Sequence, residues 1–235
     1  SYSEPFDMRI AFRKVDFGSF GIADSRQFEY PSFVRLGKEA NKLIHRACGT
    51  SLGEETLSTY SSPKRYLWDN KPSKREWEFL VLPGEESAHI LNIRGISSNI
   101  MSDGRVDVTG NNGGRTSHYS RRSLMTFAFL EMLSQANAQI NSDSYRTDIG
   151  WKSVPRKIKR IVITCPTAMS KIEREALVKC AKDAVNLYTK FIYGNNAPTI
   201  DIVPAVHSMR DQDGSWYYDE ATCAQLVYIY GEVGH

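Results

Sequence analysis

The hydrophobic pattern is clearest in the second half of the chain, where a short apolar run precedes a helical stripe. Residues 161–163 are apolar and β-branched, which is typical of a buried strand. Pro166 ends the run, and Ser170 with Glu173 matches the pattern of a helix-capping box. Behind the cap, apolar residues recur at steps of three and four and predict a helix to about residue 188: Met169, Ile172, Ala176, Cys180, Ala184 and Leu187. A strand, a proline turn and a capped helix together indicate half of an α/β unit.

The first fifty residues predict two strands and a helix. Polar and apolar residues alternate over 8–13, as in a half-buried strand. A second strand is expected over 28–34, where Pro31 favours an edge or a bulge. Apolar residues at helical spacing over 38–47 predict a helix that ends at Gly49.

The middle of the chain mixes predicted strands, loops and one long helix. Residues 77–82 and 88–93 read as a hairpin, and 102–117 as a mobile surface loop with a glycine-rich tip. The alternative for that tip, a phosphate cradle, lacks a convincing strand before it. Residues 120–140 predict a largely buried helix capped by Ser120, and 141–159 a polar linker.

The end of the chain predicts a strand over 200–203 and a helix over 221–230 that is apolar nearly all round, capped by Asp219. We therefore predict an α/β protein with an inserted or appended β-rich portion.

Composition and charge narrow the class of protein. The chain has 235 residues and a formal net charge of +3, too small to imply binding to nucleic acid or to an acidic membrane. Its apolar stretches are about half as long as a membrane crossing requires. The four cysteines lie far apart, outside zinc or CxxC spacing, and we interpret them as reduced core thiols of a cytosolic protein; a disulfide pair is the alternative.

One candidate for phosphate chemistry is the turn that contains Asp16, Gly18 and Ser19. An aspartate at the end of a strand can hold a hydrated Mg²⁺, while backbone amides of a small-residue turn contact phosphate oxygens. The alternative is an ordinary turn between two strands.

Two further candidates are single charged residues. A lysine such as Lys64 can stabilise the charge that develops during phosphoryl transfer, and Pro63 and the nearby aromatics favour a fixed position; a solvated surface pair with Arg65 is the alternative. Asp219 and Glu220 stand at a helix start, where one carboxylate can cap the helix and the other can orient a water; capping alone also explains them. No metal-ligand cluster, GxSxG, Walker A or GxGxxG pattern is present in the sequence.

The order of these segments resembles the nucleotide-binding domain of DnaK-type heat-shock chaperones. Residues 161–169 with 173–176 resemble that family's "ITVPA…QR.A" strand and helix, and 219–226 resemble its "NEPTAAAL" helix. Residues 30–34 resemble "TPSYV". The stretch 62–67 resembles "DAKRLIG", in which the lysine is catalytic.

The segments "SSPKRYLWD", "ITCPTAM…ER" and "DEATCAQLVYIY" are more closely similar to the SrfB-type bacterial virulence-factor family. The resemblance implies an actin/DnaK-like (ribonuclease H-like) first lobe, a mixed sheet flanked by helices with an inserted smaller subdomain. Residues 1–50 and 155–235 would form the core subdomain, and 51–154 the insertion. The chain is expected to be part of a longer protein, with the second lobe beyond His235.

The resemblance also implies ligands and roles. ATP and Mg²⁺ would bind between two lobes, with Lys64 on the γ-phosphate, Glu220 on a water, and Pro166 as a hinge. Asp16 would hold the metal through water, and Asp16, Gly18 and Ser19 would bind the nucleotide. Fewer residues separate Asp16 from Pro31 than separate the phosphate-binding turn from the matching proline in the DnaK pattern. The alternative is therefore that Asp16 belongs to a later turn and is not the phosphate-loop aspartate.

A competing class is a non-catalytic scaffold that uses the same fold and binds a protein partner in a virulence-associated complex. For either function we expect a bacterial cytoplasmic location, or export without a classical signal.

Overall fold

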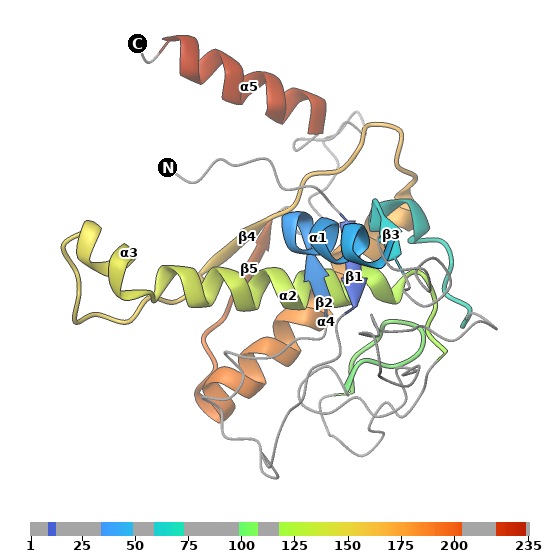
Figure 1. Cartoon of the computed structure of the whole chain (residues 1–235), viewed down its shortest axis with the longest axis horizontal. Helices are drawn as coiled ribbons and strands as arrows, with labels where there is room; N and C mark the ends of the chain where they lie inside the picture. Colours follow the sequence, from blue (N-terminus) through green and yellow to red (C-terminus); the bar gives the residue numbers. More distant parts are fainter. Residues whose placement is uncertain are drawn as a thin grey trace.

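The computed structural model describes residues 9–12, 34–48, 59–72, 99–107, 118–203 and 220–233, which form a mixed α/β structure with two small sheets (Figure 1). The predicted hairpin over 77–93, the glycine tip at 111–114 and most of the predicted strand over 28–34 lie outside these residues.

The first sheet is antiparallel and has its first strand in the middle. β1 (Arg9–Phe12) pairs with β2 (Val34–Leu36) on one side and with β3 (Thr59–Ser61) on the other. Ile10 stands opposite Leu36 and Tyr60 in the two registers. The alternation over residues 8–13 therefore predicted a strand correctly.

Helices cover both faces of this sheet because successive side chains of β1 point in opposite directions. Ile10 belongs to the main core with α2 (Ser123–Ile140), whereas Ala11 packs with Ala40 and Leu43 of α1 (Gly37–Cys48). The predicted helix over 38–47 is confirmed.

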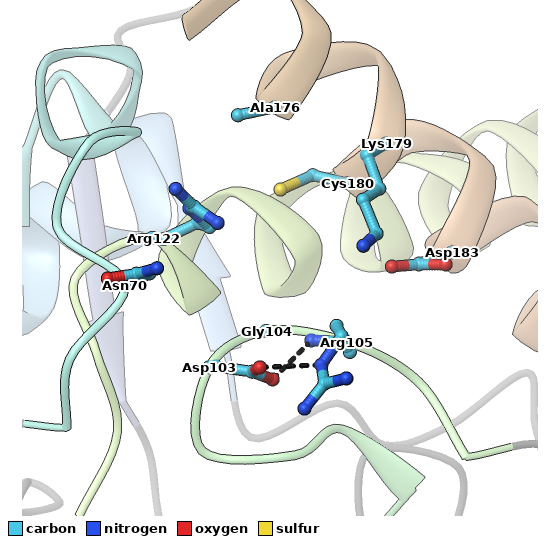
Figure 2. Close-up of a pocket in the computed structure, with 9 residues that line it drawn as sticks. All are labelled: Asn70, Asp103, Gly104, Arg105, Arg122, Ala176, Lys179, Cys180 and Asp183. Carbon is cyan, nitrogen blue, oxygen red and sulfur yellow. Dashed lines mark hydrogen bonds and ion pairs between the residues drawn. The ribbon is translucent and has the colours of Figure 1, made fainter. Parts of the chain in front are cut away.

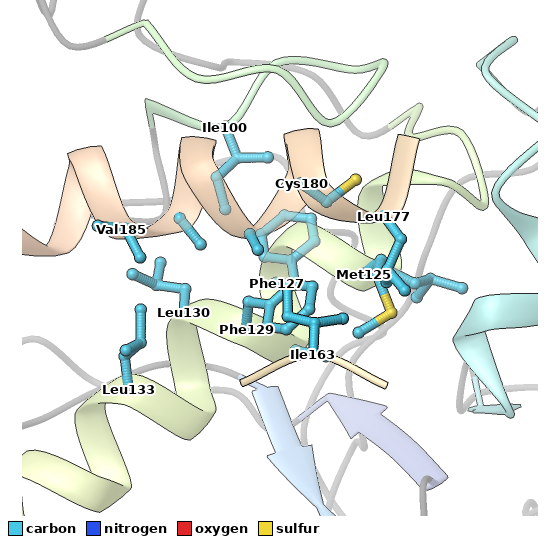
Figure 3. Close-up of a cluster of buried hydrophobic side chains, with 14 of the residues drawn as sticks. Ile100, Met125, Phe127, Phe129, Leu130, Leu133, Ile163, Leu177, Cys180 and Val185 are labelled. Atoms are coloured by element: carbon cyan, nitrogen blue, oxygen red, sulfur yellow. The ribbon is translucent and has the colours of Figure 1, made fainter. Parts of the chain in front are cut away.

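The main core lies between α2 and α4 (Lys171–Tyr193), which pack against each other (Figure 3). Every residue from Ser123 to Glu131 in the first half of α2 is buried, polar and apolar alike, and so is Leu133. Such all-round burial fits the wide apolar face that the sequence predicts. The two helices supply most of the core: Leu124, Met125, Phe127, Ala128, Phe129, Leu130, Leu133, Leu177, Val178, Cys180, Ala181, Ala184, Val185, Leu187 and Tyr188.

The second sheet is parallel and joins β4 (Arg160–Val162) to β5 (Asp201–Val203), with α4 between them in the chain. Ile163 extends the pairing, since its amide donates to Val203 O at 2.8 Å. The prediction of a wholly buried strand was wrong for Val162, which is 56% exposed, whereas Ile163 is 4% exposed. The period of two places them on opposite faces, and only one face meets the core.

The predicted capping box at the start of α4 is present. Ser170 Oγ accepts from the Glu173 amide at 3.3 Å, and the Glu173 carboxylate accepts from the Ser170 amide at 3.0 Å. The helix continues five residues past the predicted end. The predicted stripe was wrong at Ile172, which is 72% exposed, because it lies in the first turn, before the helix passes under α2.

The start of α2 differs from the prediction. The helix begins at Ser123, after a tight turn in which the Ser123 amide bonds to Ser120 O at 3.1 Å, and the N-cap residue is Arg122. Residues 102–107 of the predicted mobile loop pack against this turn. Gly104 is buried with φ +85°, and a Cβ there would meet Ser123 Cα at 2.8 Å, so a side chain is excluded.

The predicted polar linker contains a short helix, α3 (Asp143–Asp148), beyond the end of α2 (Figure 1). Ser142 Oγ accepts from the Tyr145 amide, and Arg146 pairs with Asp143 at 3.0 Å. None of its residues is buried, so there was no apolar periodicity to detect. In the described part of the chain, no helix combines the length and apolar character that a membrane span needs.

Substitution of Ile163 by alanine should destabilise the protein by about 3 kcal/mol, because it leaves a cavity in the core. The matched variant Val162→Ala removes a half-exposed side chain and should cost less than about 1 kcal/mol. Urea unfolding of both variants gives the comparison. Equal losses would contradict the observed orientation of this strand.

Glu173→Ala should lower stability by about 1 kcal/mol at neutral pH, because it removes half of the capping box. The hydrogen bonds from the Ser170 side chain and amide lower the pKa of Glu173. The stabilisation is therefore complete above the unfolded-state pKa and is lost as the pH falls through the lower folded-state pKa. Thermal melts against pH test this, with Glu175→Ala as the control on the same helix; a pH-independent difference would contradict it.

Candidate functional site

Lys64 lies on a short 3₁₀ helix, η2 (Pro63–Tyr66), that follows directly on β3. Ser62, the residue before it, has φ 50°, a left-handed conformation that costs energy for a residue other than glycine. Pro63 is buried, and the Arg65 amide closes the turn onto Ser62 O at 2.9 Å. These constraints fix the base of the Lys64 side chain, as the flanking residues predicted.

The Lys64 ammonium contacts two groups that are distant in sequence. Nζ donates to Thr164 O at 3.0 Å and forms a hydrogen-bonded ion pair with the Glu220 carboxylate. The Lys64 and Glu220 side chains are 28% and 40% exposed. Both therefore remain accessible to a ligand while they contact each other.

Glu220 is the first residue of α5 (Glu220–Val233). Its amide donates to Cys165 O at 3.0 Å, while its carboxylate contacts Lys64. The turn after β4 thus presents two successive carbonyl groups, one to the ammonium of Lys64 and one to the start of α5. A carboxylate in the first turn also interacts favourably with the helix dipole.

Two arginines at the start of α2 contact η2 and the residues that follow it. Arg121 forms an ion pair with Asp69 at 2.6 Å, and its guanidinium lies over the rings of Tyr66 and Trp68, 4.7 and 5.5 Å from their centroids. Arg122 Nε donates to Leu67 O at 2.7 Å. Neither arginine was predicted from the sequence, because both lie more than fifty residues from η2.

Cys165 is buried directly behind the ion pair. Burial raises the pKa of its thiol to about 11; the nearby Lys64 lowers it and Glu220 raises it by smaller amounts. The thiol is therefore protonated at neutral pH and serves as part of the core.

The structure thus brings together the two residues that the sequence predicts as catalytic, Lys64 and Glu220. The other predicted site residues, Asp16, Gly18 and Ser19, lie outside the described residues. Among the residues that are described, there is no group of three or more histidine, cysteine, aspartate or glutamate residues able to hold a metal ion directly.

This arrangement offers a fixed cation next to a carboxylate, at the end of a strand and the start of a helix. A cation so placed can bind an anionic oxygen, and the carboxylate can orient a water through a hydrogen bond. In the state described here the two groups neutralise each other, so a ligand must compete with or join this pair.

Comparison with known proteins gives one family. The sequence profile described as "Virulence factor SrfB" matches residues 1–235. No curated protein and no solved structure matches the chain.

The buried thiols predict a pattern of chemical reactivity. At pH 8, a thiol with a pKa of about 11 is roughly one thousandth ionised, and only the thiolate reacts. Iodoacetamide followed by peptide mass spectrometry should therefore label the partly exposed Cys223 well before Cys165. In denaturant both should react alike. Equally fast labelling in the native state would contradict the burial of Cys165.

Proposed function

We propose that this chain, which belongs to the SrfB virulence-factor family, forms the first lobe of an actin/DnaK-like nucleotide-binding protein. In this proposal the complete protein binds Mg·ATP, and hydrolyses it, when a second lobe closes over the site.

The contact between Lys64 and Glu220 is the observation that carries the proposal. Two separate short motifs predict these residues as catalytic, and the residues are 156 positions apart in the sequence. Their side chains nevertheless contact each other at the turn after β4, where Thr164 O accepts from the same ammonium. An enzyme that transfers a phosphoryl group needs such a cation near a group that orients water.

The pair is exposed enough for a ligand to reach both side chains. ATP would supply the phosphoryl group, and Mg²⁺ would offset its negative charge. Lys64 would exchange its contact with Glu220 for an oxygen of the γ-phosphate. The released carboxylate of Glu220 would then orient the attacking water or a water on the metal, and Pro166 in the adjoining turn would act as a hinge during closure.

A non-catalytic scaffold is the second candidate, and α5 is the observation that favours it. This helix lies apart from the other helices (Figure 1), and five of its large apolar side chains are more than half exposed: Leu226, Tyr228, Ile229, Tyr230 and Val233. An exposed apolar surface of this kind is typical of a protein-binding site. In a scaffold, the Lys64–Glu220 ion pair would only fix the start of α5.

Calorimetric titration of Mg·ATP into the full-length protein and into residues 1–235 tests the proposal. We expect binding by the full-length protein, weaker binding by this chain, and loss of binding and hydrolysis in the full-length Lys64→Ala variant. Glu220→Gln should keep most of the affinity and lose turnover, since its proposed role concerns water.

The stability of both variants provides the control. A partly exposed ion pair contributes little, so Lys64→Ala and Glu220→Gln should each cost about 1 kcal/mol or less. Unchanged hydrolysis in Lys64→Ala would exclude its catalytic role. Absence of Mg·ATP binding to the full-length protein would exclude the nucleotide-binding function and favour the scaffold.

A further inference from the structure

A second polar site lies between α4 and the start of α2, in a pocket of about 250 Å³ (Figure 2). It is separate from the site proposed for ATP, since neither Lys64 nor Glu220 lines it. We propose that this pocket binds a small zwitterion of the α-amino acid type. Its carboxylate would lie against Arg122 and Lys179, and its ammonium against Asp183.

Charges of opposite sign face this pocket, and Lys179 attracts Asp183 along α4 without forming a hydrogen bond to it. Figure 2 shows Arg122 on one side and Asp183 on the other, with Lys179 on the same helix as Asp183. In the described part of the chain, neither the Lys179 nor the Asp183 side chain forms a hydrogen bond or an ion pair. A ligand with two opposite charges would satisfy both sides at once.

Arg122 is held so that its outer nitrogens are available. Its Nε donates to Leu67 O at 2.7 Å, which fixes the plane of the guanidinium. Within the described residues, the two terminal nitrogens have no hydrogen-bond partner, and a carboxylate can accept from such a pair.

The remaining polar groups leave the balance of charge unchanged. Asp103 accepts from Arg105 Nε at 2.5 Å and from the Arg105 amide at 3.1 Å, so that wall is neutral. Burial raises the pKa of the Cys180 thiol to about 11, and the thiol is uncharged. Partial burial also raises the pKa of Asp183, and the nearby Lys179 and Arg105 offset only part of that effect.

The size of the pocket limits the ligand. Pockets for drug-sized molecules enclose about 300–1,000 Å³. At about 250 Å³ this pocket fits a single amino acid rather than a nucleotide or a peptide. A bare anion would satisfy Arg122 but would give Asp183 no hydrogen-bonded cation.

Saturation-transfer NMR of the purified protein with a mixture of the twenty amino acids tests the proposal. We expect signal transfer to one or a few amino acids. The N-acetyl derivative and the methyl ester of the best binder should each bind at least about tenfold more weakly, because each lacks one charge.

Variants on α4 test whether the amino acid binds in this pocket. Asp183→Asn and Lys179→Met should each weaken binding about tenfold or more. Lys182→Met, an exposed lysine of the same helix, and Lys64→Ala, in the other site, should leave it unchanged. Asp183→Asn and Lys179→Met break no hydrogen bond or ion pair of the described residues, so thermal melts should remain close to wild type.

Three outcomes would overturn the proposal: no amino acid binds, the derivatives bind as well as the parent, or Asp183→Asn leaves affinity unchanged. Inorganic phosphate binding as tightly as the best amino acid would show a simple anion site and would overturn it as well. None of these results depends on whether the protein binds ATP.

Discussion

The packing of α2 against α4 is the constraint on which the rest of the structure depends. The two helices form most of the main core, and the antiparallel sheet packs on α2 through Ile10, Val34 and Leu36. Close packing at the start of α2 excludes a side chain at Gly104, whose carbonyl accepts from Thr126 Oγ1 at 2.7 Å. The loop at residues 99–107 is therefore held by the same helix that supports the sheet.

This packing also positions the polar groups of both proposed sites. Arg121 and Arg122 stand at the start of α2, where one holds η2 through Asp69 and the other through Leu67 O. The α4 helix follows the turn whose carbonyls contact Lys64 and the amide of Glu220. One helix pair thus fixes both the support of Lys64 and the wall of the zwitterion pocket, although the two sites share no residue. Arg122 connects the two sites, since it lines the pocket and donates to Leu67 O, the residue after η2.

The two sites differ in how charge is balanced. Lys64 and Glu220 already neutralise each other, so a ligand there must replace a contact. The terminal nitrogens of Arg122 and the carboxylate of Asp183 face a pocket without a hydrogen bond in the described structure, and a dipolar ligand would add contacts without breaking one. The family assignment supports neither ligand by itself, since a fold or family does not determine chemistry. The chemistry at each site is argued from the side chains that meet there.

Local patterns in the sequence were sufficient for elements that local interactions determine. The Ser170–Glu173 box, the alternation in β1 and the wide apolar face of α2 involve neighbours within one turn or one strand. Short motifs also identified Lys64 and Glu220, but not their contact. Only the tertiary structure decided that Val162 faces solvent, that Ile172 lies outside the core, and that Arg122, Lys179 and Asp183 line one pocket. These outcomes depend on which face of an element meets another element far away in the chain, and no local periodicity contains that information.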